Sequence, residues 1–307
     1  MKVFTGSEYS SLYLEALRAC REEGEYRCSR VGNVYDLGPT CFEVSSNEAG
    51  LPFIKGRGLN PFFALAELAW FYQGSNELSP LRYFIPNYDQ YSDDGKTLYG
   101  AYGYRVTHKF GFDQLNRVVE ELKVKPESRR AVISLYDAGD LNTLDSLDIP
   151  CNLSALFKIR DDLLDITVFN RSNDVFKGIP YNFFLFRFLQ YWAAKKLGKK
   201  IGVHRHITDS LHLYESDKLN MEPAIAAQKG SSVDSVYLEL NIFDELIASS
   251  SAIHSLEWGK ITEGKLRWLF LSYQAFKEKK DDSFFRQSDA GGRLSPYVED
   301  WLDTHYS

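Results

Sequence analysis

The chain has 307 residues, of which 44% are hydrophobic and 15% aromatic, so it is long enough to bury a substantial core as one large domain or two ordinary ones. Its formal net charge of −6 argues against a general nucleic-acid-binding protein, for which a basic face is needed, and we expect no DNA partner. It has no stretch of membrane-spanning length and no secretion signal at its N-terminus, so we expect a cytoplasmic protein that does not bind membranes.

The four cysteines form no Cys-x-x-Cys pair, so we expect no structural zinc and no metal site. They are Cys20, Cys28, Cys41 and Cys151. Free thiols in a reducing compartment are the default interpretation.

In chain order, residues 8–24 show the apolar period of an amphipathic helix, and residues 28–55 show the glycines, prolines and alternation of strands and turns. Asn60 is a good N-cap and Pro61 suits a first helical position, which predicts a helix to about Tyr72. Residues 114–125 are expected to form a further helix and residues 131–136 a buried strand.

The second half begins with a predicted hairpin, whose strands are 154–160 and 163–170 with Asp161-Asp162 near the turn. Residues 183–197 are apolar almost all round, so this helix should be central or at an interface. Past residue 217 the chain becomes more helical and more charged, notably over 233–255 and 264–280. These elements indicate an α+β protein with a large mixed or antiparallel sheet and a soft boundary near 217–230.

Cys151 stands in Asp-Ile-Pro-Cys-Asn (148–152), after a proline and at the mouth of a hairpin strand. An isolated cysteine is usually a small buried hydrophobe. As a nucleophile it needs a nearby cation, because a free thiol with a pKa of about 8.5 is only slightly ionised at pH 7. Arg171 offers that cation.

Glu67 lies inside the predicted helix among apolar neighbours. A carboxylate there is either paired with a core arginine or is a general acid/base with a raised pKa. The pattern leaves both interpretations open.

Arginines stand beside several strand-like segments, namely Arg30, Arg129, Arg130 and Arg171. Guanidinium groups that converge on one point would suit a phosphate, although a solvated surface position is the commoner role of any one arginine.

Other polar residues have two interpretations each. His212 and Tyr214 alternate in a strand-like stretch and share one face. His204-x-His206 could bind metal in principle, but an ordinary strand is favoured because no third ligand is near. Asn182 could be a helix N-cap or an amide that pairs with the edge of a bound base.

In combination, these residues resemble the thymidylate synthase superfamily, which includes the pyrimidine-nucleotide hydroxymethylases, over roughly residues 25–217. The matching motifs are Arg30, Ala-Glu67-Leu-Ala-Trp, Tyr102-Gly103, Pro-Glu-Ser-Arg129-Arg130, Pro150-Cys151, Arg171-Ser172-x-Asp174, Gly-x-Pro-Tyr-Asn182 and His212-x-Tyr214. From Cys151 to Tyr214 the family's spacing is kept without a gap.

The resemblance implies a thymidylate synthase-like fold, with a six-stranded mixed sheet at a homodimer interface and helices on the other face. Residues 1–217 would form the catalytic domain, and residues 218–307 a helical C-terminal extension packed on it. The expected substrates are a pyrimidine nucleoside 5′-monophosphate and 5,10-methylenetetrahydrofolate.

The resemblance also assigns roles. Cys151 would add to ring C6, Asn182 would hold the base, and Glu67 with Tyr102 would run the proton transfers. The phosphate would be bound by Arg30, Arg171 and Ser172, with Arg129 and Arg130 of the other subunit. The sugar would be bound by His212 and Tyr214, and the folate by Asp174, Tyr88 and Tyr91.

Departures from the family pattern concern the last step. Asn152 replaces a histidine, Tyr88 and Tyr91 replace a tryptophan pair on the folate side, and the terminal Asp-Thr-His-Tyr-Ser is unlike the closing tail of synthases. Hydride transfer needs water to be excluded, so we expect water to complete the reaction and give a hydroxymethyl product. An amide at position 182 favours uracil, which makes dUMP the first expected substrate and dCMP the second.

Alternatives from other classes remain. One is thymidylate synthase proper, which methylates dUMP reductively. Another is a catalytically silent nucleotide-binding relative, against which the intact set of Cys151, Glu67, Arg171 and Asn182 argues. RNA binding is a minor third, and the acidic composition gives it little support.

Overall fold

The computed structural model describes residues 1–143, 145–227, 236–279, 283–286 and 289–306. Its larger sheet is six-stranded and mixed, as expected, in the order β1-β4-β9-β7-β6-β5. The strands are β1 (Lys2–Gly6), β4 (Thr40–Val44), β5 (Val132–Ser134), β6 (Asn152–Arg160), β7 (Leu163–Asn170) and β9 (Lys200–Thr208). The pairs β1/β4 and β7/β9 are parallel and the others antiparallel.

The predicted hairpin is confirmed as β6 and β7. Asp161 and Asp162 both have positive φ, 47° and 68°, as a tight turn between twisted strands requires. The predicted buried strand at 131–136 is wrong in extent and in burial. It is the edge strand β5, in which Ile133 is buried while Val132 and Ser134 are exposed.

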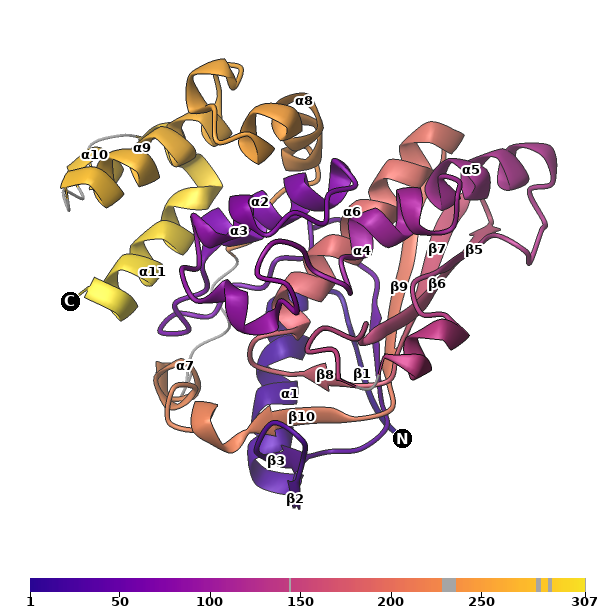
Figure 1. Ribbon diagram of the computed structural model, residues 1–307, viewed down its shortest axis with the longest axis horizontal. Helices are drawn as coiled ribbons and strands as arrows, with labels where there is room; N and C mark the ends of the chain where they lie inside the picture. The colour runs from indigo at the N-terminus through magenta and orange to yellow at the C-terminus, as the bar shows by residue number, and fades with distance from the viewer. Residues whose placement is uncertain (144, 228–235, 280–282, 287–288, 307) are drawn as a thin grey trace.

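Helices cover one face of this sheet (Figure 1). The helices in contact with its strands are α1 (Tyr9–Glu23), α5 (Gln114–Val124) and α6 (Ile179–Leu197), and α2 (Pro61–Tyr72) packs on α6. The N-cap of α2 is confirmed, because the Asn60 side chain accepts a hydrogen bond from the Phe63 amide at 2.9 Å. α6 begins four residues earlier than predicted, since Pro180 suits its first turn, and so Asn182 is not its N-cap.

A second, four-stranded sheet was not expected from the sequence. It consists of β2 (Glu25–Cys28), β3 (Asn33–Asp36), β10 (Leu211–Tyr214) and β8 (Asn173–Asp174). Its parallel β8/β10 pair places His212 opposite Asp174. Two residues that lie far apart in the sequence are thereby brought to one place.

The helices predicted at 233–255 and 264–280 are confirmed from residue 242 and from residue 265, whereas residues 236–241 are not helical; residues 228–235 and 280 lie outside the described part. The α-helices described after residue 217 are α7 (Glu222–Ala227), α8 (Ile242–His254), α9 (Lys265–Lys279), α10 (Ser283–Arg286) and α11 (Ser295–Tyr306). In Figure 1, α8 to α11 lie beyond α2, and both α8 and α11 pack against α2. Short helical segments connect the rest: α3 (Ser79–Arg82), η1 (Tyr88–Tyr91), α4 (Tyr102–Tyr104), η2 (Arg105–Lys109), η3 (Ala138–Asn142), η4 (Glu215–Asp217), η5 (Trp258–Lys260) and η6 (Asp289–Leu294).

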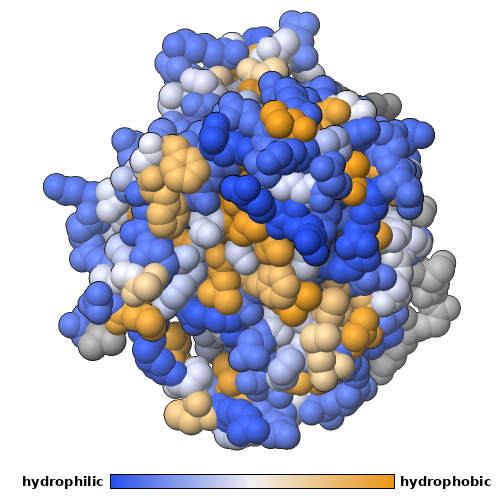
Figure 2. Space-filling model, turned by 90° about the vertical axis from the view of Figure 1, so that its right-hand side faces the viewer, coloured by the Kyte–Doolittle hydropathy of each residue, from blue (hydrophilic) through white to orange (hydrophobic). Residues whose placement is uncertain are grey.

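The two faces of the six-stranded sheet differ. One transverse row, formed by Ile133, Ala155, Val168, His206 and Phe42, is buried under the helices. The alternate rows are half-buried or exposed and contain Val132, Leu156, Thr167 and Arg205, and Phe169 with Ile207. Figure 2 shows this side of the molecule, where apolar patches lie between polar ones. In the described ranges, no helix is long and apolar enough to cross a membrane.

Candidate active site

The Cys151 thiol lies directly before β6 and is half-buried. The Arg171 amide donates to the Cys151 carbonyl oxygen at 2.9 Å, and the Arg171 guanidinium donates to the carbonyl oxygens of Pro150 and Ile149 at 3.0 and 2.9 Å. Burial raises the pKa of the thiol, and Arg171 lowers it by charge and by a hydrogen bond. Arg171 therefore acts in the expected direction, but burial outweighs it.

Glu67 lies on α2 with a carboxyl group whose pKa burial raises to about 7, while a hydrogen bond from Tyr88 lowers it. No ion pair of Glu67 occurs in the described part of the chain. The interpretation as a carboxylate paired with a core arginine is therefore wrong. A carboxyl group that is half-ionised near pH 7 can both accept and donate a proton.

Tyr88 and Tyr102 connect Glu67 to Cys151, since Tyr88 interacts with Glu67 and with Tyr102, and Tyr102 with Cys151. The Tyr102 hydroxyl accepts from the Asn152 amide at 3.4 Å, and its pKa is raised, first by burial and then by the neighbouring Cys151. The Tyr88 and Tyr91 rings meet edge to face, with centroids 5.3 Å apart. Tyr91 is 43% exposed, so this aromatic pair is open to solvent on one side.

Asn182 belongs to a chain of amides. It donates from Nδ2 to Asn173 Oδ1 at 3.2 Å and accepts at Oδ1 from Asn152 Nδ2 at 3.3 Å. Asn173 Nδ2 in turn contacts His206 Nε2 at 3.0 Å. Burial lowers the pKa of His206 to about 3, so this imidazole is neutral. The orientation of Asn182 is thus coupled to three neighbouring side chains.

The residues expected to bind phosphate and sugar gather around β10. The Ser172 hydroxyl contacts His212 Nδ1 at 3.4 Å, and the His212 and Tyr214 rings meet edge to face at 5.1 Å. The charges of Arg30 and Cys151 both affect the pKa of Tyr214, so Arg30, from the N-terminal part of the chain, lies at the same site.

Asp174 lies beside this group. Its Oδ1 accepts from the amides of Phe176 and Lys177 at 2.7 and 3.0 Å, and burial raises its pKa. The negative charge of Asp174 raises the pKa values of Tyr91 and Tyr214. Asp174 therefore lies between the expected folate and nucleotide residues.

Arg129 and Arg130 are not brought to this site within one chain. Both are exposed and precede the edge strand β5. The Arg130 side chain acts on the pKa of Glu121 on α5. The four cationic candidates therefore separate into Arg30 and Arg171 at the site and these two at the sheet edge.

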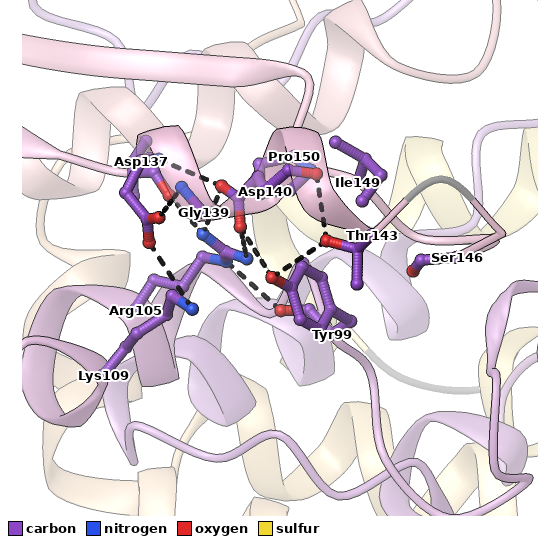
Figure 3. A network of polar contacts seen from close by, with 12 residues as sticks. Tyr99, Arg105, Lys109, Asp137, Gly139, Asp140, Thr143, Ser146, Ile149 and Pro150 are labelled. Atoms are coloured by element: carbon purple, nitrogen blue, oxygen red, sulfur yellow. Dashed lines mark hydrogen bonds and ion pairs between the residues drawn. The ribbon is translucent and has the colours of Figure 1, made fainter.

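A buried ion pair braces the segments before Tyr102 and Cys151 (Figure 3). Arg105 and Asp140 have fully buried side chains and pair at 2.9 Å, and the Tyr99 hydroxyl donates to Asp140 at 2.8 Å. Burial would raise the pKa of Asp140, but the hydrogen bonds from Arg105 and its other partners lower it. The sequence had offered no signal for this pair, because its members are 35 residues apart.

The sequence also gave no role to Asp148, although it stands three residues before Cys151. Its Oδ2 accepts from the Gly100 amide at 2.8 Å, and its charge acts on Cys151, Tyr102 and Tyr88. Burial raises its pKa to about 6. A second carboxyl group therefore borders the thiol.

His204 and His206 belong to β9, as the strand interpretation predicted. His204 Nδ1 contacts the Tyr9 hydroxyl at 2.9 Å, and burial lowers the pKa of both imidazoles. The described residues contain no cluster of three or more His, Cys, Asp or Glu that could hold a metal ion.

Comparison with known proteins gives the family. The family model of thymidylate synthase matches residues 11–247. A deoxyuridylate hydroxymethyltransferase of Bacillus phage SP01 is 34% identical over 230 residues, covering 71% of this chain and 60% of the relative. Another, of Pseudomonas phage M6, is 36% identical over 218 residues, covering 70% and 62%. The chain thus spans about three fifths of the length of these relatives, and it belongs to the thymidylate synthase family.

Proposed function

We propose that this protein transfers a one-carbon unit to C5 of dUMP and that water completes the reaction, giving a hydroxymethyl group. The observation that carries the proposal is the Cys151 thiol bordered by Arg171, by the tyrosines that lead to Glu67, and by the Asn182 amide chain. The names of the two phage relatives support the same reaction.

Cys151 begins the reaction by adding its sulfur to C6 of the pyrimidine. Burial favours the protonated thiol, so its proton passes to a water molecule as the S–C6 bond forms, while the C5=C6 electron pair moves toward C5 and O4. Asn182 stabilises the charge that develops at O4, since its Nδ2 retains one hydrogen that Asn173 does not use. Arg171 stabilises the sulfur whenever it is anionic.

The folate side suits a flat heterocycle. Tyr88 and Tyr91 offer aromatic surfaces, and Asp174 has a carboxylate that can accept from ring N–H groups. When bound, methylenetetrahydrofolate supplies the carbon at the oxidation level of formaldehyde. Once C5 has bonded to that carbon, Glu67, half-ionised at neutral pH, would accept the C5 proton and return a proton to the nitrogen from which the carbon departs, which leaves an exocyclic methylene group on the nucleotide.

Water finishes the reaction on the nucleotide. Its oxygen adds to the exocyclic methylene carbon, its proton passes to a base, and the electrons return through the ring to expel the Cys151 sulfur. The exposed fraction of Tyr91, 43%, supports entry of water from this side. A water-excluding wall would favour hydride and a methyl product instead.

The amide chain supports uracil as the base. Neutral His206 can accept from Asn173 Nδ2, so that Asn173 Oδ1 accepts from Asn182 and Asn182 Oδ1 accepts from Asn152. Asn182 can then still donate to O4 and accept from N3–H of uracil. If His206 instead donated from Nε2, the side-chain amides of Asn173, Asn182 and Asn152 would each have the opposite orientation. Asn182 would then present the donor and acceptor pattern that is complementary to cytosine.

We further propose a homodimer through the open sheet face. Phe169, Ile207, Leu156 and Val132 give that face apolar character, and a helix-free apolar face suits a second copy related by a two-fold axis. Arg129 and Arg130, exposed beside the edge strand, would then reach the phosphate of the partner subunit. We retain 1–217 as the catalytic domain, 218–307 as its helical extension, and a cytoplasmic location.

The test uses dUMP and dCMP carrying tritium at C5, together with methylenetetrahydrofolate. The proposal expects tritium release with dUMP and a product heavier by CH2O. A product heavier by CH2 would mean thymidylate synthase, and no release from either nucleotide would mean a silent relative. Cys151→Ser, shown to be folded by circular dichroism, should abolish release; unchanged release would remove the nucleophile assignment.

A further inference from the structure

The C-terminal helix α11 holds the loop that precedes α2. The Asp300 carboxylate accepts from the Gly56 amide at Oδ1, 2.5 Å away, and from the Gly58 amide at Oδ2, 2.8 Å away. The side chain is buried, and these two amides are its hydrogen-bond partners within the described residues. The Tyr297 hydroxyl, one turn earlier, donates to the Leu51 carbonyl oxygen at 2.8 Å.

The approach of α11 to this loop requires glycine. Gly58 has φ +61°, and a Cβ atom there would lie 2.6 Å from the Thr304 methyl group. Gly56 has φ +78° and faces the backbone of Pro223 on α7. Both glycines are therefore needed for the loop to lie between two C-terminal helices.

Arg57 stands between these glycines and connects the loop to the candidate site. Its guanidinium lies over the Phe176 ring, 3.6 Å from the centroid, and donates to the Phe176 carbonyl oxygen and to the Tyr13 hydroxyl. The Phe176 amide donates to Asp174 at 2.7 Å. A continuous series of contacts thus runs from Asp300 through Arg57 to Asp174.

We infer that Asp300 is a positioning residue for the folate side of the site, because it fixes the loop from which Arg57 holds the Phe176 backbone and hence Asp174. The nucleotide residues Cys151 and Arg171 are held by other contacts, to one another and to the segment before β6. The C-terminal helix therefore controls affinity for the folate more than for the nucleotide. This consequence rests on the proposed function, whereas the series of contacts does not.

The experiment compares Asp300→Asn with Glu299→Gln in the full chain. Glu299 is the neighbouring, exposed residue of α11, so its variant removes the same charge without touching the loop. Two readouts are used: amide hydrogen exchange of residues 54–60 and 173–178 in the free protein, and the KM values for folate and for dUMP with kcat.

Asp300→Asn should increase amide hydrogen exchange in both segments. It should also raise the KM for folate about tenfold, which corresponds to about 1.4 kcal/mol from the loss of charged hydrogen bonds. The KM for dUMP and kcat should each change less than about twofold. Glu299→Gln should change none of these. Faster exchange at 54–60 without a change at 173–178, or equal rises in both KM values, would overturn the inference.

A second variant separates positioning from unfolding. Arg57→Met should reproduce the folate effect with α11 in place, and Asp300→Asn should add little to it, because both act on one series of contacts. Fully additive effects would refute the route through Arg57. If no nucleotide reacts at all, the proposed function fails, and the exchange measurement still tests the contacts.

Discussion

Two charges of opposite sign, on Arg171 and Asp148, modify the pKa of the Cys151 thiol, which burial raises, and removing each should change the reactivity of the thiol in the opposite direction. Burial raises the pKa of the thiol, Arg171 lowers it, and the negative charge of Asp148 raises it further. Asp148→Asn should therefore increase the thiolate fraction at neutral pH, and Arg171→Gln should decrease it. Because the thiolate is the reacting form, the rate of alkylation follows that fraction.

The magnitude follows from the charge interaction. At an effective dielectric constant of about 20, unit charges a few ångströms apart interact by about 2–4 kcal/mol, and solvent in a partly exposed site reduces this to about 1 kcal/mol. That corresponds to about a fivefold change in thiolate fraction. We expect about fivefold faster alkylation for Asp148→Asn and about fivefold slower alkylation for Arg171→Gln.

The effect of Asp148 should also depend on pH. Burial raises the pKa of Asp148 to about 6, with opposing effects of the Gly100 amide and Arg105, which lower it, and of Asp93, which raises it. At pH 5 the carboxyl group is largely protonated and exerts little charge on the thiol. The ratio of the variant rate to the wild-type rate should therefore be near one at pH 5 and reach its full value by pH 8.

The assay measures iodoacetamide labelling of the Cys151 peptide by mass spectrometry between pH 5 and 8. A Cys28→Ser background removes the exposed thiol that would otherwise compete, while Cys20 and Cys41 are buried. Slower labelling of Asp148→Asn, or a rate ratio that stays constant with pH, would show that Asp148 does not act on the thiol through its charge.

Three further predictions concern Glu67, the buried ion pair and the sheet face. Glu67→Gln should lower tritium release about 10²–10⁴-fold, and equal release would exclude the proton-transfer role. Because burial raises the pKa of Glu67 to about 7, the ionised carboxylate destabilises the folded protein above that pH, so the variant should unfold at a higher temperature than wild type at pH 8 but not at pH 4. Asp140→Ala should cost about 3–5 kcal/mol of unfolding free energy in urea, because it leaves Arg105 buried and unpaired, and the loss should shrink as pH falls through the lowered pKa of Asp140; a cost under about 1 kcal/mol would contradict this. Phe169→Glu should convert a dimer into monomers in sedimentation velocity, and an unchanged mass would move the interface elsewhere.

Elements with local signals were predictable from the sequence. Asn60 and Pro61 fixed the start of α2 because capping needs only neighbouring residues. Asp161 and Asp162 indicated the β6–β7 turn for the same reason. The mixed six-stranded sheet followed from the family resemblance, since strand order is a property of distant pairings.

Features built from distant segments were not predictable. The four-stranded sheet joins β2 and β3 to β8 and β10 across most of the chain. The strand expected at 131–136 failed because an apolar run does not distinguish a central strand from an edge strand with one exposed face. Tertiary packing likewise creates the Arg105–Asp140 pair, the position of Asp148 and the contacts of Asp300. Local sequence patterns do not indicate such contacts.

Three carboxylates in and near this site are held by hydrogen bonds from backbone amides. Asp148 binds the Gly100 amide, Asp174 binds the amides of Phe176 and Lys177, and Asp300 binds those of Gly56 and Gly58. A backbone amide fixes the direction of a carboxylate and leaves its negative charge in place. At Asp140, by contrast, the positive charge of the paired Arg105 cancels it. Asp148 and Asp174 therefore remain able to act on Cys151, whose pKa both of them raise. In the proposed reaction, burial and these two carboxylates would keep the Cys151 thiol protonated until a bound ring makes the anion favourable, which would limit unproductive reactions of the thiol between turnovers.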